Sequence, residues 1–494
     1  MILKRLIYLT ALFSAINSKA TPLGTPLASA SIQEPWKILK IVEITSTGPS
    51  GPLNIVKNRP WIKNDSNPQF LTEVGKRQGY NNGLNTNARF PSIFQNWMKR
   101  GNLTLTHYTR ARGTRRAIQY AISHSLGLFS NFHDAKIGLD KGSEKLRPPG
   151  KQGGFLNSSG VNFTTALPFG YNPVIVDSQR PLGDFLLDLA AICKPIQNQT
   201  RDRYNGLDQL LSQDSNIKSL LQSVMTAYNL PESWEPQKSI FSKLTILADF
   251  ALQDYYSSLN PVLDPSKSTQ NQQIFDQLKR VDTVYRSYNW TTDRSKLQIT
   301  GLLEAIINNF SNKIKGKSVE KILPFYTHYS AEDNILIPFL ALIQQTNSSC
   351  SISALQSNTT ANETKCPFSP PPASNLIFEL IAKPSAPQQP FVKVSYNGEY
   401  VDFCGNEKID PNTKNEFICS FEEFLAVSLK WYLQGARLKE CGFFVLRSIP
   451  WGFYLLLAVS LLSLMFIMFL FTQIRTTRSG LQKKFDESKV RLLS

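Results

Sequence analysis

The chain has 494 residues, 41% of them apolar, and a formal net charge of +17. This length and composition suffice for a large buried core, so disorder is not the default expectation. The chain could form one large domain with an insertion or two to three smaller ones. Lys and Arg form no run interleaved with aromatic residues, so no nucleic-acid partner is expected.

The first residues have the arrangement of a secretory signal peptide. Lys4 and Arg5 precede an apolar run at 6–16, and small residues that suit a cleavage point follow it. We therefore expect residues 1–20 to be removed, which leaves residues 21–445 as the ectodomain.

An apolar, β-branched run at residues 38–44 ends in a turn rich in Gly, Pro and Ser at 46–52. This pattern predicts the first strand of an α/β domain, followed by the kind of loop that holds a site at the carboxyl end of a strand. After Glu43 the loop has no His, Arg, Cys or carboxylate, so it offers no obvious nucleophile or anion-binding side chain.

Helix and strand patterns alternate in the next segment. We expect a helix at 71–80, capped by Thr72 and ended or interrupted by Gly83, then a short strand at 102–107 and a helix at 117–129. The basic residues between that strand and helix are Arg110, Arg112, Arg115 and Arg116.

Residues from about 140 to 310 are interpreted as a helical cap insertion that covers the sheet. Pro and Asn clusters separate its helical patterns, which fall at 182–192, 207–230 and 240–256. A strand is then expected at 322–330, followed by a helix capped by Asp333 or Asn334.

The rest of the ectodomain combines cysteines with strand patterns. Residues 346–374 are interpreted as a surface loop held by a disulfide. After this loop we expect, in order, paired strands at 376–381 and 391–396, a turn at Asn397-Gly398, a second disulfide loop at 404–419 and a helix at 421–433.

The cysteine count is even, at six, and no two cysteines form a close CxxC pair. Three disulfides are the simplest arrangement, and neither a zinc site nor any other metal or cofactor is expected. With the signal peptide, ten Asn-x-Ser/Thr triplets indicate a glycoprotein of the secretory pathway. They begin at Asn64, Asn102, Asn157, Asn162, Asn198, Asn289, Asn309, Asn347, Asn358 and Asn362.

Residues 451–474 carry no charge and are long enough to cross a hydrocarbon core of roughly 30 Å as a helix, the alternative being a buried core helix. Residues 475–494 hold six basic and two acidic residues, so we expect a cytosolic tail and a single-pass type I membrane protein. The ectodomain would face the extracellular side or a lysosomal or vesicular lumen. The signal peptide's three basic residues and the tail's net charge of +4 leave +10 for the ectodomain, which could favour an anionic ligand or reflect solvated surface charge.

Several motifs of the ectodomain occur in the order and spacing of a known enzyme family. They are Leu71-Thr72 with Gly75, Gln78 and Gly83; Arg110 and Arg116 with Gly127-Leu128-Phe129; Tyr329-Ser330-Ala331-Glu332-Asp333; Phe378-Glu379-Leu380; and Tyr396-Asn397-Gly398, Cys404, Cys419 and Phe421-Glu422-Glu423-Phe424. Over roughly residues 36–435 the chain thus resembles the histidine acid phosphatases of the histidine phosphatase superfamily. The resemblance implies an α/β sandwich of the phosphoglycerate mutase-like type with a helical cap insertion, to which this chain adds one C-terminal transmembrane helix.

The family's catalytic motif, R-H-G-x-R-x-P, falls on residues 46–52, where only the glycine and the proline match. The resemblance implies that Thr47 stands at the position of the nucleophilic histidine, and that Ser46 and Ser50 stand at the positions of two phosphate-binding arginines. A threonine hydroxyl would need a general base, and its phosphate ester would be stable, whereas a phosphohistidine is labile. Losing one preorganised donor commonly costs about 2.7–4 kcal/mol of transition-state stabilisation, and here two arginine clamps are missing.

Three further positions of the family's site lie downstream. By resemblance, Arg110 keeps a phosphate-binding arginine and Asp333 keeps the proton donor, whereas Glu332 replaces a histidine and puts an anion where the substrate's anion should sit. Arg110 and Asp333 could still act as a phosphate contact and a general acid, or could form an ion pair and a helix cap in an inherited scaffold. With the nucleophile gone we favour the second interpretation.

The histidines offer no clear replacement for the nucleophile. His107 and His328 lie on strands that lead towards the site, and we interpret both as buried strand residues rather than substitute nucleophiles. The dipeptide His133-Asp134 falls at the wrong place in the order of motifs, and we interpret it as a coincidence.

These observations favour a catalytically inactive pseudophosphatase that acts as a binding or structural protein, with an anionic ligand or a protein as its partner. The alternative is an active acid phosphatase that hydrolyses phosphate monoesters with a rearranged site. The pair Ser46-Thr47 separates the two hypotheses, because an active enzyme is expected to carry Arg-His there.

Overall fold

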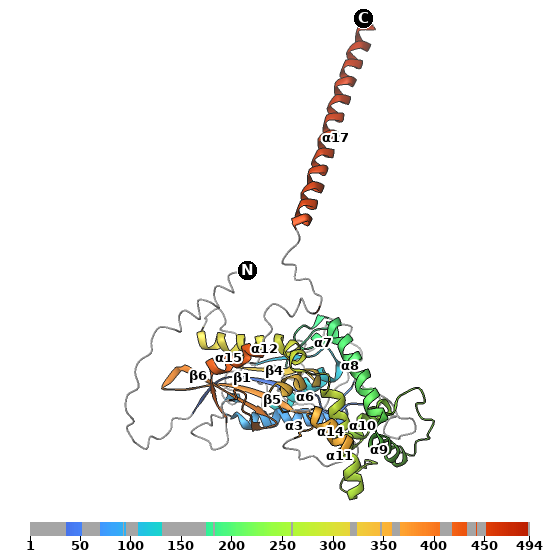
Figure 1. Cartoon of the computed structure of the whole chain (residues 1–494). Helices are drawn as coiled ribbons and strands as arrows, with labels where there is room; N and C mark the ends of the chain where they lie inside the picture. The colour runs from blue at the N-terminus through green and yellow to red at the C-terminus, as the bar shows by residue number, and fades with distance from the viewer. Residues whose placement is uncertain are drawn as a thin grey trace, which may run out of the picture.

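A computed structural model of the chain shows a mixed α/β domain followed by one long C-terminal helix (Figure 1). The structure describes residues 36–51, 70–91, 93–94, 107–130, 174–180, 183–257, 260–316, 324–345, 348–357, 366–405, 417–431, 441 and 451–492. The expected signal peptide, most of the Asn-x-Ser/Thr triplets and His133-Asp134 lie outside these residues.

The described residues form an eight-stranded sheet in the order β3-β2-β4-β1-β5-β6-β7, with β8 beside β6. The strands are β1 (Lys37–Thr45), β2 (His107–Ala111), β3 (Val176–Ser178), β4 (Tyr326–Ser330), β5 (Asn375–Lys383), β6 (Ala386–Tyr396), β7 (Glu399–Tyr400) and β8 (Cys419–Ser420). β1 pairs in parallel with β4 and antiparallel with β5. The strand expected at 38–44 is therefore a central one, which explains why residues on both of its faces are buried.

Helices cover both faces of this sheet (Figure 1). The helices of the two layers are α3 (Glu73–Arg89) and α6 (Arg115–Leu128) on one face, and α12 (Thr292–Lys315), α13 (Asp333–Leu342) and α15 (Phe421–Trp431) on the other. The first face is buried around Ile41 and Tyr326, and the second around Val42 and Phe378. This three-layer arrangement confirms the α/β sandwich expected from the sequence.

Helix α3 corrects one expectation. Thr72 caps the helix as expected, because its Oγ1 accepts a hydrogen bond from the Gly75 backbone N–H at 3.1 Å. Gly83, however, neither ends nor interrupts the helix, which continues to Arg89. A Cβ atom at Gly83 would overlap the backbone of His124 on α6, so this glycine permits a close crossing of the two helices.

The cap has a hydrophobic core of its own, built from helices α8 to α11. The cap helices are α7 (Leu189–Ile192), α8 (Lys194–Gln213), α9 (Ser215–Ala227), α10 (Ile240–Ser257) and α11 (Thr269–Ser287). The helix expected at 182–192 is only the short α7, and the one expected at 207–230 is two helices, because Asp214 separates them and caps α9. Helix α12 packs on the sheet and not on the cap core.

Three local boundaries also differ from the expectations. β2 continues to Ala111, so Arg110 lies in the strand and not in the turn after it. β3 is a further edge strand inside the segment interpreted as helical. The N-cap of α13 is Glu332, with φ 60° and no side-chain capping bond, so neither Asp333 nor Asn334 is the cap.

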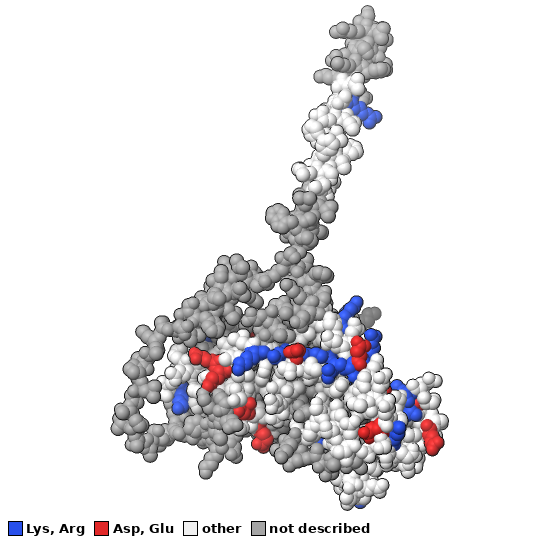
Figure 2. Space-filling model, viewed as in Figure 1, with Lys and Arg blue, Asp and Glu red and all other residues white. Residues whose placement is uncertain are grey.

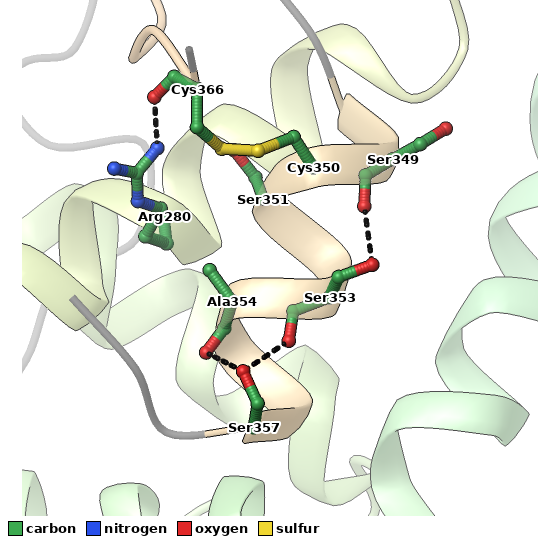
Figure 3. The surroundings of a disulfide bond; sticks show 8 residues. All are labelled: Arg280, Ser349, Cys350, Ser351, Ser353, Ala354, Ser357 and Cys366. Carbon is green, nitrogen blue, oxygen red and sulfur yellow. Dashed lines mark hydrogen bonds between the residues drawn. A yellow bond between two sulfur atoms is a disulfide. The ribbon is translucent and has the colours of Figure 1, made fainter. Parts of the chain in front are cut away.

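The segment 346–374 is more than a surface loop. Its described part contains α14 (Ser348–Ser357), and Leu355 of this helix is buried in the cap core. The Cys350–Cys366 disulfide expected here is present, and Arg280 of α11 donates a hydrogen bond to the Cys366 carbonyl oxygen (Figure 3). The disulfide closes the segment on itself, and the contacts of Leu355 and Arg280 hold the segment against the cap.

All six cysteines are paired, which confirms the expectation of three disulfides. The bonds are Cys193–Cys441, Cys350–Cys366 and Cys404–Cys419. The Cys193–Cys441 bond joins a residue that precedes the C-terminal helix to the junction of α7 and α8. Both cysteines are buried there.

The C-terminal helix, α17 (Trp451–Leu492), contains the span expected to cross a membrane. Within this helix, Val459–Leu481 is long and apolar enough for a membrane crossing, and none of it is buried. In Figure 2 this stretch is white for most of its length and ends at basic side chains. On the face of the α/β domain seen there, acidic side chains are interspersed with a row of basic ones.

Candidate functional site

The carboxyl ends of β1, β2 and β4 meet at one edge of the sheet. Thr45 and Ala111 are both register partners of Ser330. Two backbone hydrogen bonds extend this alignment beyond the strands, from Ala331 N to Thr45 O and from Arg112 N to Ser330 O, each 2.9 Å long. The loops that follow the three strands thus begin side by side, where open α/β sheets place their sites.

The loop after β1 is held tightly by its neighbours. Ser46 and Thr47 each form a 2.8 Å backbone hydrogen bond with residues 373–374. The backbone N–H of Ser50 donates to Oε1 of Gln253 on α10 at 3.1 Å. Ser46 is fully buried, and its Oγ has no hydrogen-bond partner among the described residues. These residues supply no charge and no evident nucleophile.

The glycine that this loop shares with the family's motif has a packing role. A Cβ atom at Gly48 would lie 2.6 Å from the Cα of Gly75, near the start of α3. Only glycine fits such an approach of loop to helix. This packing accounts for a glycine at position 48 whether or not its neighbours catalyse a reaction.

Glu332 is the centre of the charged part of this edge. Its carboxylate accepts hydrogen bonds from Nε and Nη2 of Arg116, each 3.0 Å long, and further bonds from Arg112 and from the Thr114 hydroxyl. The Glu332 side chain is 4% exposed. Burial raises the pKa of this carboxyl, but Arg116, Arg112 and Thr114 outweigh it and lower the pKa to about 2. Glu332 is therefore ionised and paired.

Arg110 forms its ion pair with a residue that follows β3 and not with Glu332. Its Nη2 donates to Oδ1 of Asp184 at 2.6 Å and to Oε1 of Gln179 at 2.9 Å. Asp184 is fully buried and also accepts the backbone N–H groups of Leu186 and Leu187. The guanidinium that the resemblance assigns to phosphate binding is thus engaged in a structural ion pair.

Asp333 is paired as well. Arg286 of the cap helix α11 donates a hydrogen bond to its carboxylate, and Arg286 also pairs with Asp282 at 2.7 Å. Burial raises the pKa of Asp333, while the charges of Arg286 and Arg116 act in the opposite direction. Asp333 joins the sheet edge to the cap through this arginine.

The two strand histidines lie in the core, as expected. Nε2 of His107 is 2.8 Å from Thr109 Oγ1, and Nε2 of His328 is 3.0 Å from Thr45 Oγ1. Burial lowers the pKa of His107 to about 3 and that of His328 well below its ordinary value. Both rings are neutral and held within the layer between the sheet and the helices α3 and α6.

The structure also adds residues that the sequence analysis did not assign. Arg112, Arg116 and Thr114 together enclose Glu332, and Arg286 reaches Asp333 from a helix that begins some sixty residues earlier in the chain. The cluster of arginines after β2 was a visible signal, because an acid at position 332 needs partners once it is buried. No such signal pointed to Arg286. Among the described residues no group of His, Cys, Asp and Glu is placed to hold a metal ion.

Comparison with solved structures identifies the architecture. A Hafnia alvei phytase in complex with tartrate aligns over 82% of this chain and 98% of its own, with a TM-score of 0.53 and 12% identity. A multiple inositol polyphosphate phosphatase from Bifidobacterium longum, in complex with phosphate, aligns over 83% and 95%, with a TM-score of 0.51 and 14% identity. The chain has the histidine acid phosphatase fold.

At these identities the similarity concerns the fold alone. No protein-family model matches the sequence, and no curated protein matches it either. The histidine acid phosphatase fold was nevertheless evident from separated motifs, because residues such as Gly48, Gly75 and Gly83 are required by close backbone packing. The residues that differ from the family's motifs are those at the sheet edge.

Proposed function

We propose that this protein is a single-pass type I membrane glycoprotein whose histidine acid phosphatase-like ectodomain has lost phosphatase chemistry and serves as a binding or structural protein. The observation that carries the proposal is the pairing of Glu332 with Arg112 and Arg116. Glu332 occupies the guanidinium of Arg116, and Arg112 is paired with both Glu332 and Asp188, so neither arginine is left open for an anion. The Glu332 carboxylate thus takes the place that an anionic ligand would need.

The surroundings of Thr47 support the same conclusion. No described histidine, lysine or carboxylate forms a hydrogen bond with the Thr47 side chain, so it has no visible general base. Ser46 and Ser50 are buried and uncharged. A phosphoryl group at this edge would meet the negative charge of Glu332 without a nucleophile in attacking position.

The membrane topology rests on charge and on the disulfides. The apolar span Val459–Leu481 is followed by a basic tail, which orients the ectodomain away from the cytosol by the positive-inside rule. Three disulfides are typical of an oxidising compartment. We place the ectodomain outside the cell or in a lysosomal or vesicular lumen.

Glycosylation can be tested at individual asparagines. Asn198 is exposed on α8, whereas Oδ1 of Asn309 accepts a 3.1 Å hydrogen bond from the fully buried Lys40. We expect peptide mapping of the protein from a eukaryotic host to find a glycan at Asn198 and none at Asn309. A glycan at Asn309 would contradict the inward orientation of its side chain.

The decisive experiment is an assay of aryl phosphate hydrolysis at acid pH. We expect the natural protein, full-length in detergent, to be inactive. A variant carrying Ser46→Arg, Thr47→His, Ser50→Arg and Glu332→His should gain activity if it folds, which its melting curve will show. Turnover by the natural protein that is abolished in Asp333→Ala would overturn the proposal and favour an active phosphatase with a rearranged site.

A further inference from the structure

A cavity of about 400 Å³ is lined in part by residues 373–374, whose backbone forms hydrogen bonds with Ser46 and Thr47 of the loop after β1. Its walls are one face of α3, the segment 371–375 that precedes β5, and the turn at Asn397-Gly398. The volume is within the range of about 300–1,000 Å³ that is common for small-molecule sites. None of the lining residues belongs to the loop at 46–52, and Glu332 is not among them.

The lining is dominated by side-chain amides. On α3 they follow a helical spacing of three and four residues, which brings them to one face of the helix. The amide residues are Gln78, Asn81, Asn82, Asn85, Asn375 and Asn397. An amide offers donors and an acceptor on the same planar group.

Half of these amides are fixed in orientation by the protein. Asn82 donates to the Tyr120 hydroxyl at 2.7 Å and to the Ala373 carbonyl at 2.6 Å. Asn375 donates to Glu43 at 3.1 Å, and Oδ1 of Asn397 accepts the Asn375 backbone N–H at 2.9 Å. This wall of the cavity is therefore preorganised.

The other half have no partner within the described part of the chain. The side chains of Gln78, Asn81 and Asn85 form no hydrogen bond with another described residue, and Oε1 of Gln78 is buried. A buried amide oxygen without a partner costs free energy unless a ligand or water supplies a donor. The cavity thus has hydrogen-bonding capacity that the described residues leave unused.

The only charged side chain that lines the cavity within the described residues is neutralised. Nη2 of Arg89 pairs with Oε1 of Glu379 at 2.8 Å, and the Glu379 side chain is 4% exposed. The guanidinium also lies over the Tyr400 ring. An anionic ligand would gain little here, because the arginine charge is already balanced.

We infer that this cavity binds a neutral polyhydroxylated ligand, specifically a hexopyranose unit. Vicinal hydroxyls both donate and accept, so they match amides that do the same. Pro371 and Pro372 supply an apolar wall for the C–H face of the ring. The inference goes beyond the proposed loss of catalysis and does not depend on it.

The test is saturation-transfer NMR with three probes, the methyl hexopyranosides of mannose, glucose and galactose, added to the full-length protein in detergent. We expect transfer to at least one probe, unchanged by added salt. In the double variant Asn81→Ala/Asn85→Ala the affinity for that probe should fall at least tenfold. Both asparagines are exposed on the helix, so alanine does not endanger the fold.

A matched control removes two exposed amides elsewhere. The variant Gln270→Ala/Gln273→Ala on α11 should bind the probe like the natural protein. A mannose-terminated oligosaccharide then shows whether the hexopyranose unit comes from a glycan or from a free sugar. Tighter binding of the oligosaccharide than of the methyl glycoside indicates a glycan, and equal binding indicates a free sugar. The inference would be overturned if no probe shows transfer or if both double variants bind the probe equally. It would also be overturned if the cavity binds inositol hexakisphosphate in a salt-sensitive manner and binds none of the sugars.

Discussion

At the scale of single residues, Glu332 is the centre of a buried ion-pair cluster at the edge of the sheet. Arg112, Arg116 and Thr114 supply the hydrogen-bond donors to its carboxylate. Removing one partner of such a buried group leaves the others uncompensated, which costs more than the pair contributes as a whole. The edge is therefore stable without a ligand.

The first residue-scale prediction concerns the variant Glu332→Ala. In phosphate-free buffer we expect its unfolding free energy to fall by about 3–5 kcal/mol, because two arginines lose their shared partner. Added phosphate should restore part of this stability by binding the freed arginines. Urea unfolding followed by tryptophan fluorescence measures both effects.

The control for that variant is Glu73→Ala. Glu73 pairs with Lys76 at 2.6 Å, but its side chain is 80% exposed, so its removal should change stability by less than about 1 kcal/mol. An equally small loss in Glu332→Ala, with no response to phosphate, would show that the arginines do not depend on this carboxylate.

The second residue-scale prediction concerns pH. The pKa of Glu332 is lowered to about 2, below the value of about 4.3 for an unfolded glutamate. The ionised carboxylate therefore stabilises the fold above about pH 4.3, and this contribution is lost as the pH falls through about 2. The stability difference between the natural protein and Glu332→Gln should stay constant at higher pH and shrink over this interval. A difference that persists to the lowest pH would contradict the assigned ionisation.

At the scale of elements, the crossing of α3 and α6 depends on paired glycines. A Cβ atom at Gly83 would overlap the backbone of His124, and one at Gly127 would overlap the Tyr80 carbonyl oxygen. The glycines of the sequence motif thus serve helix packing. Glycine also lowers helix propensity, which is why the sequence alone indicated a helix end at Gly83.

This crossing gives a prediction with an internal control. Gly83→Ala should lower the unfolding free energy by about 1–3 kcal/mol through overpacking, although alanine favours a helix. Gly206→Ala on α8 should instead raise it by up to about 1 kcal/mol, because no atom lies within 4 Å of the added methyl group. Thermal unfolding distinguishes the two signs. Similar effects of both variants would contradict the close crossing.

The sequence predicted helices and strands well where the pattern of apolar and turn residues is local. The strands β1, β5 and β6 and the helices α6 and α10 follow from apolar runs and turn residues near their ends. The pairing of Arg286 with Asp333 depends on how the cap folds back onto the sheet, and no local pattern carries that information. The amide cavity was missed for the same reason, since Asn375 and Asn397 lie far along the chain from α3.

At the scale of the whole molecule, the sheet and the cap are joined by long-range contacts. Arg286 of α11 donates a hydrogen bond to Asp333, and Gln253 of α10 accepts one from the backbone N–H of Ser50 in the loop after β1. The Cys193–Cys441 disulfide adds a covalent link across 248 residues of sequence. We expect the two cores to unfold together.

The disulfides allow this expectation to be tested. In the chain-entropy description a longer closed loop contributes more stability, so Cys193→Ala/Cys441→Ala should lose about 5 kcal/mol and Cys350→Ala/Cys366→Ala about 3 kcal/mol. Calorimetry of the two variants and the natural protein gives these losses. Two separate transitions in the natural protein would contradict cooperative unfolding of sheet and cap.

The Cys193–Cys441 bond also limits how the molecule can stand on a membrane. Nine residues separate Cys441 from the start of α17, and a fully extended chain gains at most about 3.6 Å per residue. With α17 in a bilayer, the junction of α7 and α8 must stay within roughly 35 Å of its surface. Reducing the bond would move the nearest described attachment point back to Trp431 and about double that radius. The Cys193–Cys441 bond therefore sets how far the junction of α7 and α8 can lie from a membrane that α17 would span.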